Sequence, residues 1–124
     1  MNHLRFRLTS AQLSDDVFVV TLRGDLDVAQ APEIDRELEA LHESGARDVI
    51  IDLLDVPFLE SSVFGVLLRH SRRLRVNGGG LTLVTDNQNV TRALGTHLFG
   101  NLRVVSTLSE ALREGTVAAP SGGS

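Results

Sequence analysis

The first part of the chain alternates between apolar and polar residues in the way that a half-buried strand does. Residues 4–13 place Leu4, Phe6 and Leu8 on one side of such a strand. Residues 17–22, Val-Phe-Val-Val-Thr-Leu, form a second apolar run, and Asp15-Asp16 lies between the two runs as a turn. This pattern predicts an antiparallel hairpin, which Gly24 ends.

Helical spacing replaces the alternation after this hairpin. Asp27 stands where it can cap the start of a helix, and Gln30 stands where its side chain can bond back to the Asp27 backbone. Pro32 falls in the first turn, where its missing N–H is harmless. The apolar positions of this predicted helix are Ile34, Leu38 and Leu41.

The central part of the chain is its most informative stretch. Residues 48–56 form an apolar run with little alternation, which is typical of a strand covered on both faces. A tight connection through Pro57 follows, and then a helix that opens on Ser61 and Ser62. One of these serines therefore lies where a helix exposes unpaired N–H groups and the positive end of its dipole, a place suited to a phosphate.

The second half of the chain repeats a strand and a helix twice. Asn77 to Gly80 form a stop and a turn, and residues 81–85 form a strand. Asn87 or Asn89 starts the next helix, whose apolar residues are Val90, Ala93, Leu94 and Leu98. Residues 102–105 form a short last strand, and Thr107 or Ser109 opens a final helix with Leu108, Ala111 and Leu112.

This order of elements predicts an α/β domain. Two strands followed by alternating helices and strands give a mixed, mostly parallel sheet of about five strands, with about four helices mainly on one face. We expect one domain over residues 1–115 and a disordered tail over residues 116–124, which have almost nothing apolar to bury.

Composition excludes several kinds of protein. The net charge is −4, which favours neither nucleic acid nor an anionic membrane surface. The chain has no cysteine, no signal peptide and no apolar run of membrane-spanning length, so we expect a cytoplasmic protein that does not insert into a membrane. All 12 basic residues are arginine, and the absence of lysine excludes a P-loop and a Schiff-base enzyme.

Two motifs resemble those of a known family. Gly24-Asp25-Leu26-Asp27 and the segment at residues 55–67 resemble the STAS domain of bacterial anti-sigma-factor antagonists, a likeness that runs from about residue 4 to residue 112. The resemblance implies a STAS fold and a binding protein that is not an enzyme. Its implied partner is an anti-sigma factor of the histidine-kinase-like ATPase type, which binds the unmodified protein and later phosphorylates one serine.

The resemblance also implies the site. The family's phosphorylated serine follows an aspartate, which places it on Ser61, with Ser62 as the second choice. The implied partner-binding residues are Asp27, Glu60, Ser61, Ser62, Val63 and Phe64.

This chain departs from the family pattern at two positions of the second motif. Glu60 stands where the family has aspartate, and Val63 stands where it has glycine. We expect the branched Val63 side chain to lie beside the serine, where a kinase would approach. With Ser61 as the helix N-cap, a phosphate on it would lie against the N–H groups of Val63 and Phe64.

Three other readings of the sequence remain open. The first is a STAS scaffold or transporter regulatory subunit that is never phosphorylated, which Val63 favours. The second is a small magnesium-dependent phosphatase that uses Asp25 and Asp27. The third is a receiver domain, with Asp15 and Asp16 beside Asp52 or Asp55; this reading, like the second, normally needs a lysine at the phosphate.

The remaining polar residues predict no catalytic, cofactor or metal site. His3, His42, His70 and His97 show no paired ligand spacing. Arg69, Arg72, Arg73 and Arg75 lie opposite the apolar side of the predicted Ser61 helix, so we expect a solvated face that does not bind nucleic acid.

Overall fold

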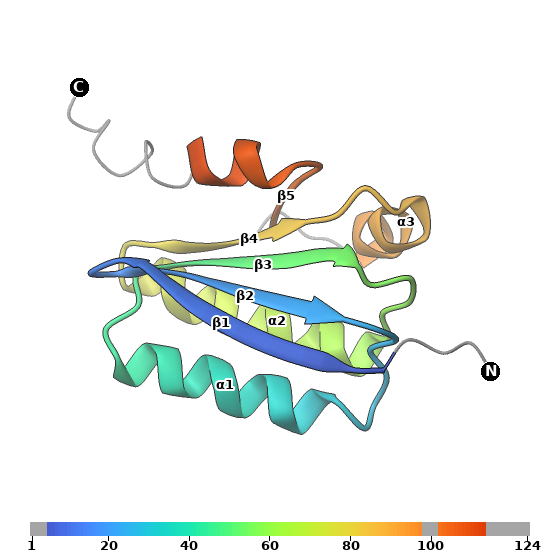
Figure 1. The fold of residues 1–124 in the computed structure, drawn as a ribbon, viewed down its shortest axis with the longest axis horizontal. Coiled ribbons are helices and arrows are strands. Elements are labelled where there is room, and N and C mark those ends of the chain that lie inside the picture. The colour runs from blue at the N-terminus through green and yellow to red at the C-terminus, as the bar shows by residue number, and fades with distance from the viewer. Residues whose placement is uncertain (1–4, 98–101, 114–124) are drawn as a thin grey trace.

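Five strands and the helices that connect them make up the fold (Figure 1). The computed structural model describes residues 5–97 and 102–113. Its elements are β1 (Arg7–Ser14), β2 (Val17–Arg23), α1 (Ala31–Glu43), β3 (Asp48–Asp55), α2 (Ser61–Val76), β4 (Gly80–Val84), α3 (Gln88–His97) and β5 (Arg103–Val105). Residues 108–113 form a last short helix. The predicted tail at residues 116–124 lies outside the described residues, as do Leu4 and Leu98.

The sheet has the predicted mixed topology. Its strands lie in the order β1-β2-β3-β4-β5, with β1 antiparallel to β2 and every other pair parallel. A hairpin turn joins the antiparallel pair, whereas each parallel pair needs a helical crossover, as the alternation of strand and helix patterns indicated. The prediction of a five-stranded, mostly parallel sheet is confirmed.

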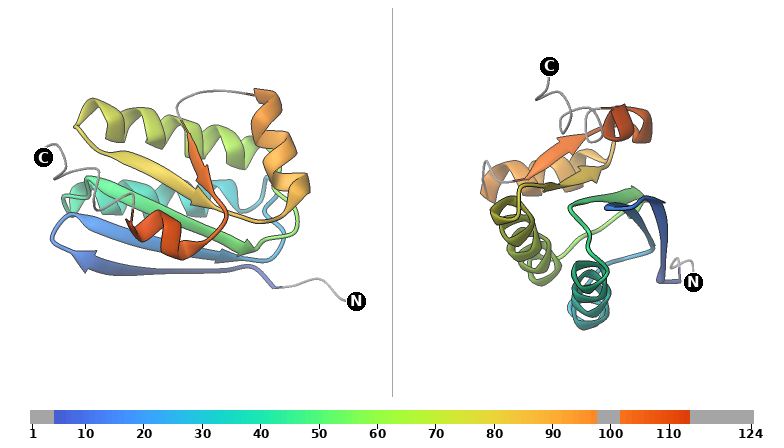
Figure 2. Two further views of the ribbon diagram at one scale, coloured as in Figure 1. Left: turned by 90° about the horizontal axis from the view of Figure 1, so that it is seen from above. Right: turned by 90° about the vertical axis from the view of Figure 1, so that its left-hand side faces the viewer.

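The two faces of the sheet are covered differently, as the right-hand view of Figure 2 shows. The main core packs the inward residues of α1 and α2 against alternate residues of β2, β3 and β4. A second, smaller core lies on the opposite face, where Ala111 of the short last helix packs with Ile50 and Val84. The helices therefore lie mainly on one face, as expected.

Hydrogen bonds show which residues cap α3 and the short last helix, for each of which the sequence left two candidates. The Asn87 side chain accepts a bond from the Asn89 N–H at 2.8 Å, so Asn87 caps α3. The Thr107 hydroxyl accepts a bond from the Glu110 N–H at 3.1 Å, so Thr107 caps the last helix.

The length and polarity of the helices bear on a membrane location. Among the described residues, no helix combines the length and the apolar composition that crossing a bilayer requires.

Candidate functional site

The two sequence motifs meet at the carboxyl end of the sheet. The loops after β2 and β3 lie side by side there because the two strands are parallel neighbours. Leu26 and Leu59 form an isolated parallel bridge between these loops. The Leu26 N–H donates to the Phe58 carbonyl at 3.0 Å, and the Glu60 N–H donates to the Leu26 carbonyl at 2.9 Å. Backbone pairing thus holds the Asp27 turn against the start of α2.

Asp27 closes a turn just before α1. Its Oδ1 accepts a bond from the Ala29 N–H at 2.9 Å, and the Gln30 Oε1 accepts one from the Asp27 N–H at 3.0 Å. Only the Gln30 half of the predicted reciprocal pair forms, because the Asp27 carboxylate bonds the Ala29 N–H, and the helix itself begins at Ala31 with Gln30 as its N-cap. Asp27 is exposed; its N–H is held by the Gln30 side chain and its carboxylate by the Ala29 N–H.

The start of α2 differs from the prediction by one residue. Glu60, not Ser61, is the N-cap, with an extended backbone at φ −88° and ψ 159°. Its carbonyl accepts the N–H groups of Val63 at 3.0 Å and Phe64 at 3.1 Å. A phosphate therefore cannot use those two N–H groups as predicted. The N–H groups of Ser61 and Ser62 are the ones with no partner among the described residues.

The two serines have different surroundings. The Ser62 hydroxyl donates to Glu60 Oε1 at 2.9 Å and is partly buried. Ser61 is exposed, and its hydroxyl makes no hydrogen bond within the described part of the chain. Ser61 is therefore the serine whose hydroxyl is both exposed and not bonded to Glu60.

Val63 and Phe64 lie in the main core rather than on the surface, with exposed fractions of 0% and 6%. The expectation that the Val63 side chain crowds the approach to Ser61 is wrong, because that side chain points inward from the first turn of α2. These two residues can affect docking only by fixing how the helix start is placed.

Two apolar residues in the loops that meet at this end of the sheet are exposed instead. Val28, in the Asp27 turn, is 63% exposed, and Phe58, in the loop before α2, is 50% exposed. The sequence interpretation did not single out either one. The available signal was a large apolar residue inside a loop of turn-forming residues, directly after Pro57. We call Val28, Phe58, Asp27, Glu60, Ser61 and Ser62 the docking surface.

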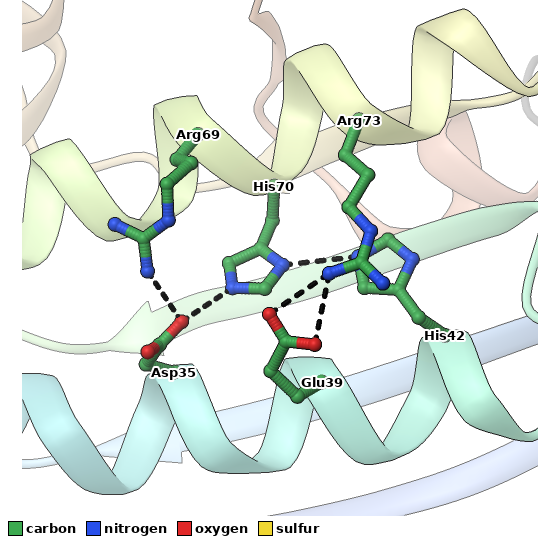
Figure 3. Close-up of polar contacts among 6 residues, drawn as sticks. All are labelled: Asp35, Glu39, His42, Arg69, His70 and Arg73. Atoms are coloured by element: carbon green, nitrogen blue, oxygen red, sulfur yellow. Dashed lines mark hydrogen bonds and ion pairs between the residues drawn. The ribbon is translucent and has the colours of Figure 1, made fainter.

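A second group of polar side chains joins α1 to α2 (Figure 3). Its members are Asp35, Glu39 and His42 from α1, and Arg69, His70 and Arg73 from α2; we call them the histidine cluster. The spacing rule for metal-ligand histidines missed it because the two histidines come from different helices. Asp35, Glu39 and His42 do share one face of a helix, which was the available signal.

The bonds in the histidine cluster form a connected network. His70 Nε2 lies 2.6 Å from Asp35 Oδ1, and His70 Nδ1 lies 3.0 Å from His42 Nε2. Arg69 donates to Asp35 at 2.5 Å, and Arg73 donates to both oxygens of Glu39 at 2.8 Å. Two of the four arginines expected on a solvated face therefore pair with α1.

These contacts shift the ionisation of the two carboxylates. The bond from His70, aided by the charge of Arg69, holds the pKa of Asp35 below its usual value, although partial burial opposes the shift. The bonds from Arg73 likewise lower the pKa of Glu39. Ligand atoms of Asp35, Glu39 and His70 lie within 4.8 Å of one another. Because arginine already balances each carboxylate, we assign no cation to this group.

The receiver-domain reading is contradicted by the sheet register. Asp15 and Asp16 lie at the β1–β2 turn, where the Asp16 carbonyl accepts the Arg47 and Asp48 N–H groups at 2.8 and 3.1 Å. Asp55 ends the same strand that Asp48 begins. At about 3.3 Å per residue, Asp52 and Asp55 lie roughly 13 and 23 Å along β3 from Asp48, so neither can share a magnesium ion with Asp15 and Asp16.

Comparison with protein families gives one extended match. The family described as the STAS domain matches residues 9–114, which is most of the chain. A curated relative, the anti-sigma-B factor antagonist of Staphylococcus epidermidis, is 27% identical over 78 residues, covering 63% of this chain and 72% of the relative.

Solved structures share the fold. An anti-sigma factor antagonist from Mycobacterium paratuberculosis superposes with a TM-score of 0.78 at 23% identity, covering 90% of this chain and 95% of that one. The Bacillus cell fate determinant SpoIIAA in its phosphorylated form superposes with a TM-score of 0.68 at 20% identity, covering 89% of this chain and 98% of that one.

Proposed function

This chain belongs to the STAS domain family, and from that premise we propose that it is an anti-sigma factor antagonist controlled by phosphorylation of Ser61. Its partner is an anti-sigma factor of the histidine-kinase-like ATPase type, which it binds in the cytoplasm while Ser61 is unmodified. The protein supplies a binding surface and a phosphate acceptor, with no catalytic group or cofactor of its own. The observation that carries the proposal is the exposed Ser61 hydroxyl at the start of α2, held beside the Asp27 turn.

The docking surface has the composition of a small interface. Phe58 and Val28 offer apolar area next to the serines, and backbone bonds already hold both loops in place. A partner therefore pays little ordering entropy in these loops when it binds. Asp27 and Glu60 place carboxylates beside the apolar residues, so the complementary surface has an apolar pocket with basic residues at its edge.

Phosphorylation reverses docking through local charge. A phosphate adds about −1.5 to −2 charges to Ser61 at neutral pH, beside the carboxylates of Glu60 and Asp27. Desolvating that charge inside an interface costs on the order of 2–5 kcal/mol. Moving a complex from almost fully bound to almost fully free takes roughly 5.5 kcal/mol, so one phosphate supplies most of the change.

The free protein tolerates the same phosphate. The unpaired N–H groups of Ser61 and Ser62 lie at the positive end of the α2 dipole, which favours a negative group by about 0.3–1 kcal/mol. The modified residue is exposed, so the phosphate keeps most of its hydration in the absence of a partner. We therefore expect phosphorylation to change binding without unfolding the domain.

The test incubates the protein with ATP and each histidine-kinase-like ATPase of its source organism, then maps phosphate by mass spectrometry. We expect one ATPase to modify wild-type protein and Ser62→Ala, but not Ser61→Ala. Binding to that ATPase should be retained in Ser61→Ala and fall at least tenfold in Ser61→Asp. Phosphate on Ser62, or equal affinities for the Ser61 variants, would overturn the proposal.

Two alternative functions remain to be weighed, an unphosphorylated scaffold and a magnesium-dependent phosphatase. The unphosphorylated scaffold was favoured by Val63, which lies in the core and does not obstruct Ser61. Turnover of a phosphate ester that requires magnesium and is lost in Asp25→Asn would instead favour the phosphatase.

A further inference from the structure

His42 and His70 share a hydrogen bond that depends on their protonation. The two rings are stacked, with centroids 5.1 Å apart and planes at 20°, and His42 Nε2 lies 3.0 Å from His70 Nδ1. Only one hydrogen fits between two nitrogens at that distance, so one ring donates and the other accepts. An accepting imidazole nitrogen carries no proton. The bond therefore exists only while at least one ring is uncharged.

The other side of His70 determines which nitrogen carries hydrogen. His70 Nε2 lies 2.6 Å from Asp35 Oδ1. An ionised carboxylate only accepts, so the hydrogen of this bond belongs to Nε2. A neutral His70 then has a bare Nδ1, which accepts the bond from His42. The pair can hold one added proton with this bond intact, but a second one places hydrogen on both facing nitrogens.

The charges around the rings do not favour a second added proton. Asp35 and Glu39 face the rings from α1, and Arg69 and Arg73 face them from α2. These four side chains sum to zero charge, so two charged rings would leave a local charge of +2. His70 is 1% exposed, and water therefore screens the repulsion poorly at that ring.

We propose that the His42–His70 pair is a proton-controlled contact between α1 and α2, closed while at least one ring is neutral and opened when both rings become charged. The contact lies in the seam between the helices whose first residues adjoin the two loops of the docking surface. The proposal does not depend on the identity of the partner, because it is measured on the isolated chain.

The direction of the pH effect follows from His42. Burial, and then the charge of Arg73, lower the pKa of His42 from its ordinary value of 6.5. Below pH 6.5 the unfolded chain therefore binds protons at this position more readily than the folded chain does. Folding stability falls as the pH drops through that value, by up to tenfold in the folding constant per pH unit per histidine.

The test measures urea unfolding by circular dichroism at pH 7.5, 6.5 and 5.5. In His42→Gln, the glutamine amide can donate to His70 Nδ1 but does not titrate. We expect the wild-type folding constant to fall by up to about fivefold more than that of His42→Gln between pH 6.5 and 5.5.

Two further measurements make the test decisive. Imidazole NMR of the wild-type protein should show the His42 ring taking up its proton only below pH 6.5, and these signals should be absent in His42→Gln. Superimposable pH profiles for wild type and His42→Gln would overturn the proposal. A second result would also overturn it: ZnCl₂, added in an amount equal to the protein at pH 7.5, raises the unfolding midpoint of wild type but not that of His70→Gln. The histidine cluster would then be a metal site.

Discussion

Leu26 pairs through its backbone with Leu59, although 32 intervening residues separate them in the sequence. This bridge extends the contact between β2 and β3 beyond the ends of both strands. It places the Asp27 turn and the start of α2 in one surface. The Leu26 side chain is fully buried in the main core, so the pairing is held by packing as well as by hydrogen bonds.

Shortening Leu26 should therefore damage both stability and docking. We expect Leu26→Ala to lose about 2–5 kcal/mol of unfolding free energy, because it leaves a cavity in a closely packed core. Urea denaturation measures the loss. Val28→Ala, two residues later and 63% exposed, is the matched control and should leave stability almost unchanged. Equal stability of the two variants would show that the bridge region is not packed as described.

Phe58 should contribute to partner binding without contributing much to folding. Its side chain is 50% exposed in the loop before α2, and Phe58→Ala should weaken docking by more than about 1 kcal/mol, or at least fivefold. The measurement is titration calorimetry with the ATPase identified by phosphorylation. Val76→Ala changes an exposed apolar residue at the far end of α2 and should bind like wild type. A loss of the same size in both variants would contradict the assignment.

Gly79 should not tolerate a side chain. A Cβ on Gly79 would lie 1.7 Å from the Arg47 carbonyl oxygen, which also accepts the Gly80 N–H at 3.2 Å and so cannot simply move aside. We expect Gly79→Ala to lower the thermal midpoint, with a cost of at least about 1–3 kcal/mol from overpacking. Gly80→Ala meets nothing within 4 Å and should be mild. A harmless Gly79→Ala would mean that this turn is placed differently.

Protonation of Asp35 should weaken the contact between α1 and α2 at a lower pH than protonation of the histidines does. The pKa of Asp35 is lowered from 3.8, mainly by the bond from His70, so its contribution to stability is present above that value and is lost as the pH falls through the lowered pKa. Stability measured between pH 5 and 3 should fall less steeply in Asp35→Asn than in wild type. Glu33→Gln, an exposed change on the same helix, should follow the wild-type curve.

Local patterns were sufficient for most of the fold. The sequence predicts the strand at residues 48–56 and the helix after Pro57 because burial on both faces leaves an apolar run with little alternation, and a helix leaves apolar residues at helical spacing. The start of α2 was misplaced by one residue. Serine is a preferred N-cap type and glutamate is not, so only the extended backbone of Glu60 shows that the cap lies one residue before Ser61.

The sequence by itself determined the order of the elements, the family resemblance and the serine at the start of α2, because all of these depend on residues close together in the chain. Tertiary structure alone decided that Val63 points inward while Phe58 stays exposed, and that His42 meets His70 across two helices. The reason is that burial and side-chain pairing depend on how helices pack over the sheet. Spacing within one segment carries no information about a contact between residues 28 positions apart.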